Sequence, residues 1–227
     1  MPATVLGRGA ALTMVLVVVA TGSFLLLEYR WLPDLLPVHF DRHGTPNGWQ
    51  YRTLPRVLIP VAVQALLALV FAAVAALLLS RPHGEQDATA PDVRAAAVAA
   101  EAVMLIALIW VTFQGYAAFA LARMWVSHRA TLPFYNLGEM VGGIASLVVA
   151  VRAHRRLGRP TPRPFVAAHW RLGQLYRNPD DPALFVPTRD GRRWTLNFGR
   201  PVAGALLGLI LVVGVLAPTL LVALALR

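Results

Sequence analysis

Long apolar runs separated by short polar passages dominate the chain. A helix that crosses the roughly 30 Å hydrocarbon core of a bilayer needs about 20 mostly apolar residues. Five windows of about this length occur, at 10–29, 55–79, 95–122, 135–151 and 201–226. The pattern therefore predicts an all-α integral membrane protein with about five transmembrane helices. The first apolar run continues without a clear small-residue cleavage site, so we expect an uncleaved anchor.

Composition agrees with this pattern and excludes several kinds of chemistry. The 227 residues are 57% hydrophobic and 14% charged, whereas soluble domains carry about 25% charged residues. The chain has no cysteine, which excludes disulfides, thiolate nucleophiles and Cys-ligated metal sites. It also has no Gly-rich phosphate loop, HExxH or GxSxG sequence. We therefore expect no cofactor and favour a binding protein over an enzyme.

The arginines predict an orientation. All 21 basic residues are arginines, and eleven of them fall in 152–200, against three aspartates. Cytoplasmic flanks of membrane helices are rich in basic residues, so we place this segment in the cytoplasm. With five helices the N-terminus is then cytoplasmic and the C-terminus outside, and 14 of the 21 arginines lie on the cytoplasmic side.

The polar passage LPVHFDRHGTPNGWQ at 35–49 then lies outside, between the first two helices. Pro33 and Pro37 disfavour helix for the residues before them, so 38–43 is expected to be extended or irregular. Pro at the second position and Gly at the last make Thr45–Gly48 a predicted β-turn. In an extended segment, every second side chain points the same way.

Two interpretations of this passage remain open. His39, Asp41 and His43 on one face would form a nitrogen and oxygen ligand set for zinc or a similar metal, with Asp34 or Glu28 as a further ligand. Alternatively, these residues form local turns, in which the Asp41 side chain caps a bend and Gly44 takes a positive φ.

The same passage resembles a known signature. Its sequence is similar to the first outer loop of bacterial multi-pass membrane proteins related to the immunity proteins against a sporulation-delaying toxin. The matching residues are Pro33, Pro37, His39, Phe40, Asp41, which replaces the usual Asn, and Gly44. Characterised members bind a secreted peptide toxin and can pass the signal to a cytoplasmic repressor. The resemblance implies a ligand-binding site at His39, Phe40, Asp41 and Gly44.

A second signature lies in the arginine-rich segment. HWRLGQLYRNPDDPALFVPTRDGRRWTLNFGRP at 169–201 resembles a short module in otherwise uncharacterised bacterial membrane proteins. The residues that we single out in it are Trp170, Tyr176, Asn178, Asp180, Asp181, Trp194 and Asn197. Two strands, at 184–187 and 192–198, are expected to pair through an Asp190–Gly191 hairpin turn.

Two features of this segment have alternative interpretations. Asp180 and Asp181 could bind a divalent cation, but adjacent carboxylates seldom converge on one ion and Asn-Pro-Asp is a common turn sequence. The arginines could attract nucleic acid. Their position beside a membrane helix instead favours anionic lipid headgroups, so we do not expect nucleic acid as a partner.

Inside the apolar windows, Glu28, Glu101, Gln114 and Glu139 are the notable polar residues, because charge in hydrocarbon is costly and often functional. All three glutamates lie near predicted helix ends, which weakens the case for a proton pathway. The pairs Gly138/Gly142 and Gly204/Gly208 have the spacing that lets helices approach closely. We expect them to pack the fourth helix against the fifth, or else to form a homodimer.

The chain thus divides into four segments: a two-helix unit at 1–80, two further helices at 81–152, the Arg-rich module at 153–200, and a last helix at 201–227. We expect a multi-pass membrane protein for extracellular ligand or peptide recognition, of an immunity or sensing type. Its expected partners are the lipid bilayer, an extracellular peptide and a cytoplasmic protein. The alternatives are a membrane-embedded metal-dependent enzyme and a transporter component, although five helices without an evident inverted repeat make a poor carrier.

Overall fold

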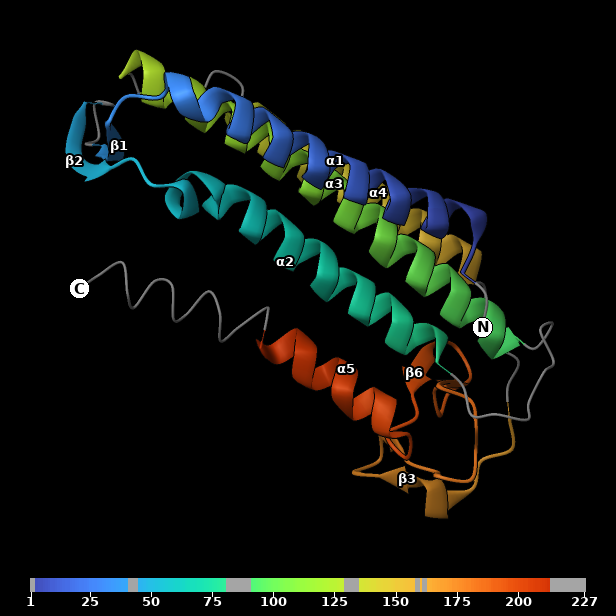
Figure 1. The fold of residues 1–227 in the computed structure, drawn as a ribbon. Helices are drawn as coiled ribbons and strands as arrows, with labels where there is room; N and C mark the ends of the chain where they lie inside the picture. Colours follow the sequence, from blue (N-terminus) through green and yellow to red (C-terminus); the bar gives the residue numbers. More distant parts are fainter. Residues whose placement is uncertain are drawn as a thin grey trace. The chain divides into compact units, whose positions relative to one another are not determined.

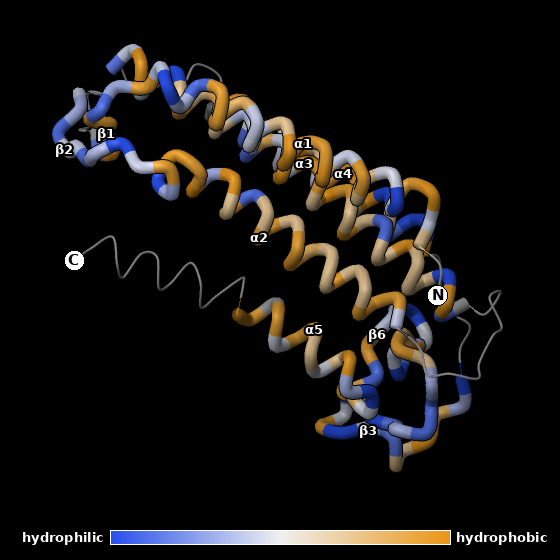
Figure 2. The backbone as a smooth tube through the Cα atoms, viewed as in Figure 1, coloured by the Kyte–Doolittle hydropathy of each residue, from blue (hydrophilic) through white to orange (hydrophobic). Residues whose placement is uncertain are grey.

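The computed structural model describes residues 3–40, 45–80, 91–128, 135–157, 160 and 163–212. It is mostly helical (Figure 1). The described α-helices are α1 (Val5–Glu28), α2 (Leu54–Leu79), α3 (Pro91–Ser127), α4 (Tyr135–Leu157) and α5 (Pro201–Leu211). Four described helices, α1 to α4, are long and apolar enough to cross a membrane. In Figure 2 their tubes are largely orange, whereas the β-strands lie in bluer stretches.

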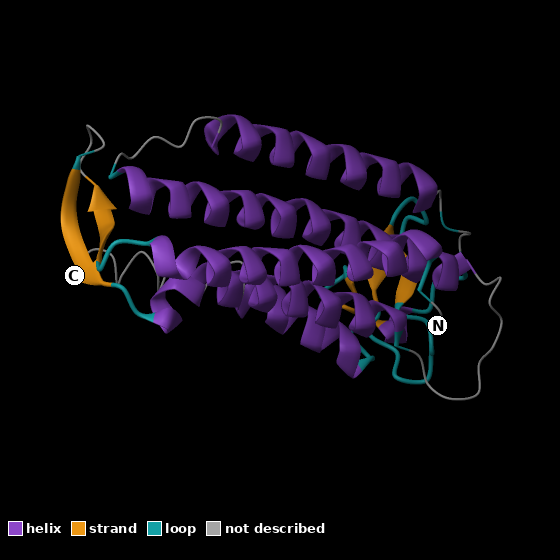
Figure 3. Ribbon diagram, turned by 45° about the horizontal axis from the view of Figure 1, so that its top comes forward, coloured by secondary structure: helices purple, strands orange, loops and turns teal. Residues whose placement is uncertain are grey.

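The remaining regular structure is short. Two 3-10 helices, Tyr29–Trp31 and Ala167–His169, and six strands complete the described elements. The strands are β1 (Leu35–Phe40), β2 (Pro46–Tyr51), β3 (Trp170–Arg171), β4 (Leu175–Tyr176), β5 (Phe185–Pro187) and β6 (Trp194–Leu196). They form three two-stranded antiparallel sheets, β1–β2, β3–β4 and β5–β6, which are orange in Figure 3.

The predicted helices agree with the structure to different degrees. The window 55–79 matches α2 almost residue for residue. Pro60 falls in its first turns, where a missing N–H is tolerated. The third helix is longer than the predicted 95–122, because α3 has 37 residues and begins at Pro91, a favourable first helical residue. Of the window 201–226, the structure describes α5 and Val212; the remainder lies outside the described residues.

The chain forms two compact units, each discontinuous in sequence. One contains residues 5–72 and 104–150, and the other contains 1–4, 73–103 and 151–227. The first, which we call the helical unit, holds most of α1 to α4 and the β1–β2 hairpin. The second, which we call the module unit, holds the Arg-rich module, α5, and the adjoining ends of α2, α3 and α4.

In the helical unit, the other three helices all pack on α3. Phe24 of α1 lies against Phe119, with ring centroids 5.3 Å apart. Gln64 of α2 donates to the Val111 carbonyl at 2.8 Å. Toward α4, Trp110 Nε1 donates to Ser146 Oγ at 3.1 Å. An apolar core at one end of this unit consists of Leu25, Leu32, Leu36, Val57, Ala118, Ala122 and Trp125.

Gly138 and Gly142 of α4 were expected to allow a close approach of the fifth helix, but they lie against α3. A Cβ on Gly138 would lie 3.1 Å from a ring carbon of Phe113, and one on Gly142 would lie 3.7 Å from Trp110. Both aromatic residues belong to α3. The expectation that Gly138 and Gly142 face the fifth helix was therefore wrong, because small residues on α4 make room for large rings on α3 instead.

Candidate functional site

The polar passage predicted as a recognition loop is an antiparallel hairpin in the helical unit. In this β1–β2 hairpin, Leu35 pairs with Tyr51 and His39 with Gly48, and the register shifts around Val38 and His39. Such bulges bend a strand and redirect its side chains. A Cβ on Gly48 would lie 2.8 Å from the Cβ of His39, so only glycine fits opposite this histidine.

The hairpin corrects the predicted turn at Thr45–Gly48. Pro46, Asn47 and Gly48 belong to β2, so the chain reverses before them. Pro46 is tolerated because it is the first residue of its strand, where no ladder hydrogen bond is required from its nitrogen. The extended backbone predicted for 38–43 is confirmed for Val38, His39 and Phe40.

The base of the hairpin is held by one arginine. Arg52 donates to the backbone carbonyls of Tyr29 and Leu32, and it forms an ion pair with Asp34 at 3.0 Å. Its guanidinium also lies 5.0 Å from the centre of the Tyr29 ring. Charge-assisted hydrogen bonds are stronger than neutral ones. One side chain thus joins the end of α1 to the start of α2 and orients the hairpin between them.

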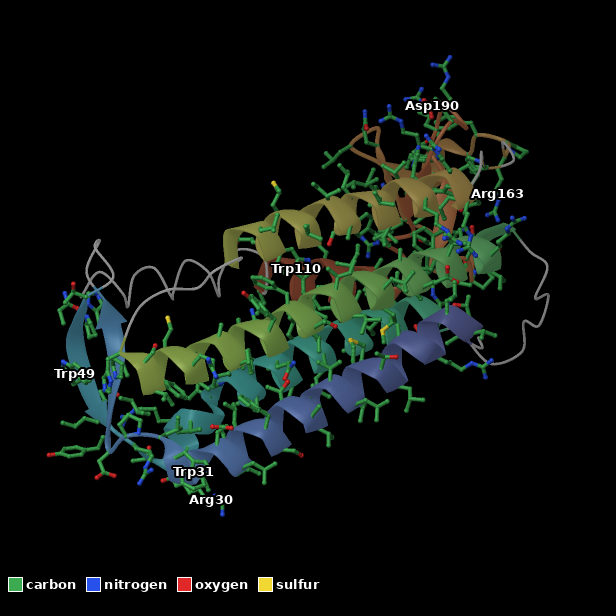
Figure 4. All side chains as sticks on the ribbon, turned by 90° about the horizontal axis from the view of Figure 1, so that it is seen from above. Arg30, Trp31, Trp49, Trp110, Arg163 and Asp190 are labelled. Atoms are coloured by element: carbon green, nitrogen blue, oxygen red, sulfur yellow. The ribbon has the colours of Figure 1, made fainter. Side chains whose placement is uncertain are left out.

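The hairpin has a buried part and an exposed part. Leu36 is fully buried in the apolar core. Val38, Trp49 and Tyr51, in contrast, are exposed. The Trp49 ring lies 5.5 Å from that of His128, centroid to centroid. Figure 4 shows Trp49 at the same end of this unit as Trp31, which follows α1. The hairpin therefore exposes large aromatic side chains, while the buried Leu36 and the contacts of Arg52 hold its backbone in place.

Only part of the predicted ligand-binding set lies in the described structure. His39 is exposed on β1, and its Nδ1 is hydrogen-bonded to the Asn47 side-chain oxygen on β2. Phe40 is the last residue of β1 and pairs with Pro46 through the backbone. Asp41 and Gly44 lie outside the described residues, as does His43 of the hypothetical metal set. Among the described residues, no group of three His, Cys, Asp or Glu side chains could hold a metal ion.

In the module unit, one buried amide, that of Asn197, joins two further motif residues, Asn178 and Asp181. Asn197 is fully buried. Its Oδ1 accepts from the backbone N–H groups of Asn178 and Gly199, at 3.0 and 2.9 Å. Its Nδ2 donates to three backbone carbonyls, at 2.8, 3.0 and 3.3 Å, those of Asn178, Asp181 and Ala183. This one side chain fixes the Asn-Pro-Asp-Asp-Pro loop against the segment that precedes α5.

The two aspartates of this loop serve its turns. Asp181 Oδ1 accepts from the Ala183 N–H at 3.0 Å, and the Asp180 N–H donates to Asn178 Oδ1 at 3.0 Å. Asp181 Oδ2 accepts from the Tyr176 hydroxyl at 3.0 Å and from Arg163 at 2.8 Å. These contacts support the turn interpretation, because the Asp181 carboxylate and the Asn178 amide oxygen satisfy neighbouring donors, and Asp180 takes part through its backbone N–H.

The environment of Tyr176 alters its acidity. Burial raises the pKa of the Tyr176 hydroxyl above its ordinary value, and the Asp181 carboxylate raises this pKa further, against a lowering by Asn178. The hydroxyl therefore remains a proton donor to Asp181 throughout the neutral range.

The two tryptophans of the motif, Trp170 and Trp194, lie on different hairpins. Trp170 of β3 pairs with Tyr176 of β4, with their rings 5.3 Å apart. Trp194 of β6 pairs with Pro187, and its indole N–H is buried without a described partner. The predicted β5–β6 hairpin is confirmed, with Gly191 at a φ of 66°. The β3–β4 hairpin was not predicted, because two-residue strands leave no periodic pattern.

The β5–β6 turn is closed by a threonine and an aspartate. Thr188 Oγ1 donates to Asp190 Oδ1 at 2.5 Å, and the Arg192 N–H donates to the same oxygen at 3.1 Å. The hydrogen bond from Thr188 is the largest cause of a lowered Asp190 pKa, followed by that from the Arg192 backbone. Figure 4 labels Asp190 and Arg163, which both belong to this unit.

A cavity of about 270 Å³ lies within the Arg-rich module. It is bordered by Phe165, Trp170 and Tyr176, with Arg163 and Arg189 among its charged lining. The Arg189 guanidinium lies 4.7 Å from the centre of the Phe165 ring, and Arg163 is already paired with Asp181. One of the two arginines in this cavity is thus neutralised within the module.

Sequence reasoning missed the main buried polar contacts. Gln64 is fully buried in α2, and its Oε1 has no described partner. Glu101, predicted near a helix end, lies well inside α3, since that helix starts earlier than expected; it is 4% exposed and forms an ion pair with Arg156. A buried carboxylate needs a charged partner, and this rule would have pointed to the arginines at the end of α4.

Comparison with known proteins yields no relative. No family model matches this chain, and neither the curated proteins nor the solved structures contain a match.

Proposed function

We propose that this chain is a multi-pass membrane protein that recognises an extracellular peptide, in an immunity or sensing role. The proposal combines four helices of membrane-spanning length and composition with a hairpin that presents exposed aromatic side chains. The resemblance of 33–44 to the loop of toxin-immunity proteins points to the same class of ligand.

The proposed topology has five membrane helices. The fifth is the apolar window 201–226, of which α5 is the first part. The arginine bias places the N-terminus and the Arg-rich module in the cytoplasm and the β1–β2 hairpin outside. The ends of α4 and α5 then tether the Arg-rich module to the inner membrane surface from both sides.

The main support for peptide binding is the structure of the β1–β2 hairpin. Within the described residues its strands pair only with each other, so each strand has an outer edge. An extended peptide can add to such an edge through backbone hydrogen bonds, while exposed side chains select its sequence. Because Arg52 and the buried Leu36 hold the hairpin in place, little ordering entropy opposes binding.

Cysteine labelling tests the topology. The chain has no cysteine of its own, so single cysteines can replace Thr45, beside the hairpin, and Asp180, an exposed residue of the Arg-rich module. We expect a membrane-impermeant maleimide to label the first in intact cells and the second only after lysis. Labelling of Asp180→Cys from outside would refute the orientation.

Binding is tested with a displayed library of linear peptides, panned against the chain in nanodiscs. We expect wild type to enrich a peptide motif and Trp49→Ala to lose that enrichment. Trp31→Ala is the matched control, since Trp31 is an exposed tryptophan outside the hairpin. Enrichment that survives Trp49→Ala, or that Trp31→Ala removes equally, would contradict recognition by the hairpin.

A further inference from the structure

The turn between β3 and β4 exposes a leucine in an unusual backbone conformation. The Gln174 N–H donates to the Arg171 carbonyl at 3.1 Å and closes this turn. Its central residues, Leu172 and Gly173, have φ values of 50° and 73°, which is the pattern of a type I′ turn. Asn-Gly is the favoured sequence there, and the left-handed conformation is disfavoured for leucine.

Packing against the described part of the chain does not offset this unfavourable backbone conformation of Leu172. Its side chain is 91% exposed, the highest value among the described large hydrophobic residues. A residue that fits its turn poorly and packs against no part of the described chain suggests a role in contact with something else.

We propose that Leu172 is a membrane-inserting tip, which docks the Arg-rich module onto an anionic phospholipid leaflet. This inference rests on the proposed membrane topology and adds to it a specific lipid contact of the module.

The connection of the β3–β4 hairpin to α5 places the tip within reach of the membrane surface. The Phe198 N–H donates to the Tyr176 carbonyl at 2.9 Å, just before α5 begins at Pro201. Tyr176 is four residues from Leu172, an extended residue spans about 3.3 Å, and hydrogen-bonded backbone segments lie about 5 Å apart, so the tip lies within about 18 Å of Phe198. Both α5 and the hairpin belong to the module unit.

The charge near the tip favours an anionic surface. Arg171 precedes the turn and Arg177 follows β4, and both are exposed. The segment 152–200 carries eleven arginines against three aspartates. Each arginine near an anionic leaflet strengthens docking by roughly fivefold.

The tip also has apolar neighbours. Leu175 on β4 and Phe165 are exposed, and the Phe165 ring stacks near Trp170 of β3 at 6.4 Å between centroids. In Figure 2 the tube near β3 is mostly hydrophilic with a short hydrophobic end. An apolar tip flanked by arginines matches the interface between headgroups and acyl chains.

The test uses a fluorescent reporter beside the tip. Gln174→Cys in the otherwise cysteine-free full chain is labelled with an environment-sensitive dye and reconstituted into nanodiscs. One lipid is phosphatidylcholine alone, and the other is a one-to-two mixture of phosphatidylglycerol and phosphatidylcholine. We expect a blue shift and a severalfold fall in quenching by aqueous iodide in the anionic discs. Asp180→Cys, an exposed position on another loop, should remain quenched equally in both lipids.

Two variants separate docking from folding. Leu172→Asn introduces the residue that the turn favours, so it preserves the hairpin while weakening docking by roughly tenfold or more, as expected for one buried leucine. Arg171→Gln should weaken docking by about fivefold.

Two outcomes would overturn the inference. In one, the chain incorporates into nanodiscs but the reporter stays quenched in both lipids, which leaves the membrane topology intact. In the other, the reporter is protected equally in both lipids and in detergent, which indicates a protein contact. A chain that fails to incorporate into lipid at all would instead refute the proposed function, and with it the docking.

Discussion

Two amide side chains, Asn197 in the module unit and Gln64 in the helical unit, are both fully buried, but they are satisfied very differently. Asn197 uses its oxygen for two backbone N–H groups and its nitrogen for three carbonyls. Gln64 donates one hydrogen bond, to the Val111 carbonyl, and its oxygen has no described partner. The first amide builds a loop, whereas the second joins two helices that apolar packing already brings together.

The comparison predicts unequal consequences of removing each amide. A hydrogen bond contributes about 1 kcal/mol net, but a buried group left without its partner costs about 1–3 kcal/mol. Stability should therefore depend on how many backbone groups each side chain satisfies, and far less on its burial.

Asn197→Ala should have the largest effect. It leaves two N–H groups and three carbonyls without their partner, and we expect a loss of at least about 5 kcal/mol. This would unfold the Arg-rich module and leave α1 to α4 intact, as measured by proteolysis and amide hydrogen exchange. Asn178→Ala is the matched control: it removes the side-chain bond to the Asp180 N–H and the side-chain interaction with Tyr176, and should cost about 1–2 kcal/mol. Equal effects of the two variants would contradict the role of Asn197.

Arg156→Gln extends the comparison to a charged group. It leaves the carboxylate of Glu101, which is 4% exposed, without its ion-pair partner, and we expect a loss of about 3–5 kcal/mol. Thermal unfolding in detergent measures this loss. The double variant with Glu101→Gln should recover most of it, because no buried charge then remains. Failure of the double variant to recover would show that the arginine acts elsewhere.

Gln64→Met should be nearly neutral, within about 1 kcal/mol, because it removes one hydrogen bond and one unpaired oxygen together. The two side chains are similar in size, so packing is preserved. Gln114→Met, at a partly exposed position of α3, is the control. A loss above about 2 kcal/mol for Gln64→Met alone would show that its oxygen has a partner outside the described residues.

The smallest expected effect is an acid dependence of the β5–β6 turn. Because the folded state lowers the pKa of Asp190, its contribution to stability is present above the ordinary aspartate pKa of about 3.9 and is lost as pH falls through the lowered folded value. Asp190→Asn should remove this dependence. Hydrogen exchange of the Gly191 and Arg192 amides across that acid range measures it; an unchanged profile in the variant would assign the dependence to another group.

Apolar pattern and turn chemistry predicted much of the fold. Continuous apolar runs located α1 to α4, because hydrocarbon-length helices leave a strong signal. Asp190–Gly191 located the β5–β6 hairpin, since this dipeptide favours the required positive φ. The boundaries of α3 were less accurate, because Asp92 and Arg94 are polar and yet continue the helix beyond the apolar run.

Long-range contacts were beyond sequence reasoning. The hydrogen-bond partner of Gln64, the Val111 carbonyl, lies 47 residues away in sequence, and no local pattern predicts this contact. Asn197 was singled out only within a motif, and its five backbone partners depend on two loops meeting. A Cβ on Gly199 would lie 2.4 Å from the Asn178 carbonyl carbon, so this glycine is required by a neighbour that the sequence does not reveal.

The position of the Glu101–Arg156 ion pair has a consequence for membrane thickness. With 37 residues, α3 is about 55 Å long, and Glu101 lies about 15 Å from its first residue. Under the proposed topology, the remaining length of about 39 Å can cross a typical hydrocarbon core with some tilt. In a thicker bilayer, hydrophobic mismatch would draw the ion pair into the acyl chains, where charge is costly. The ion pair therefore sets an upper limit to the bilayer thickness that this chain tolerates.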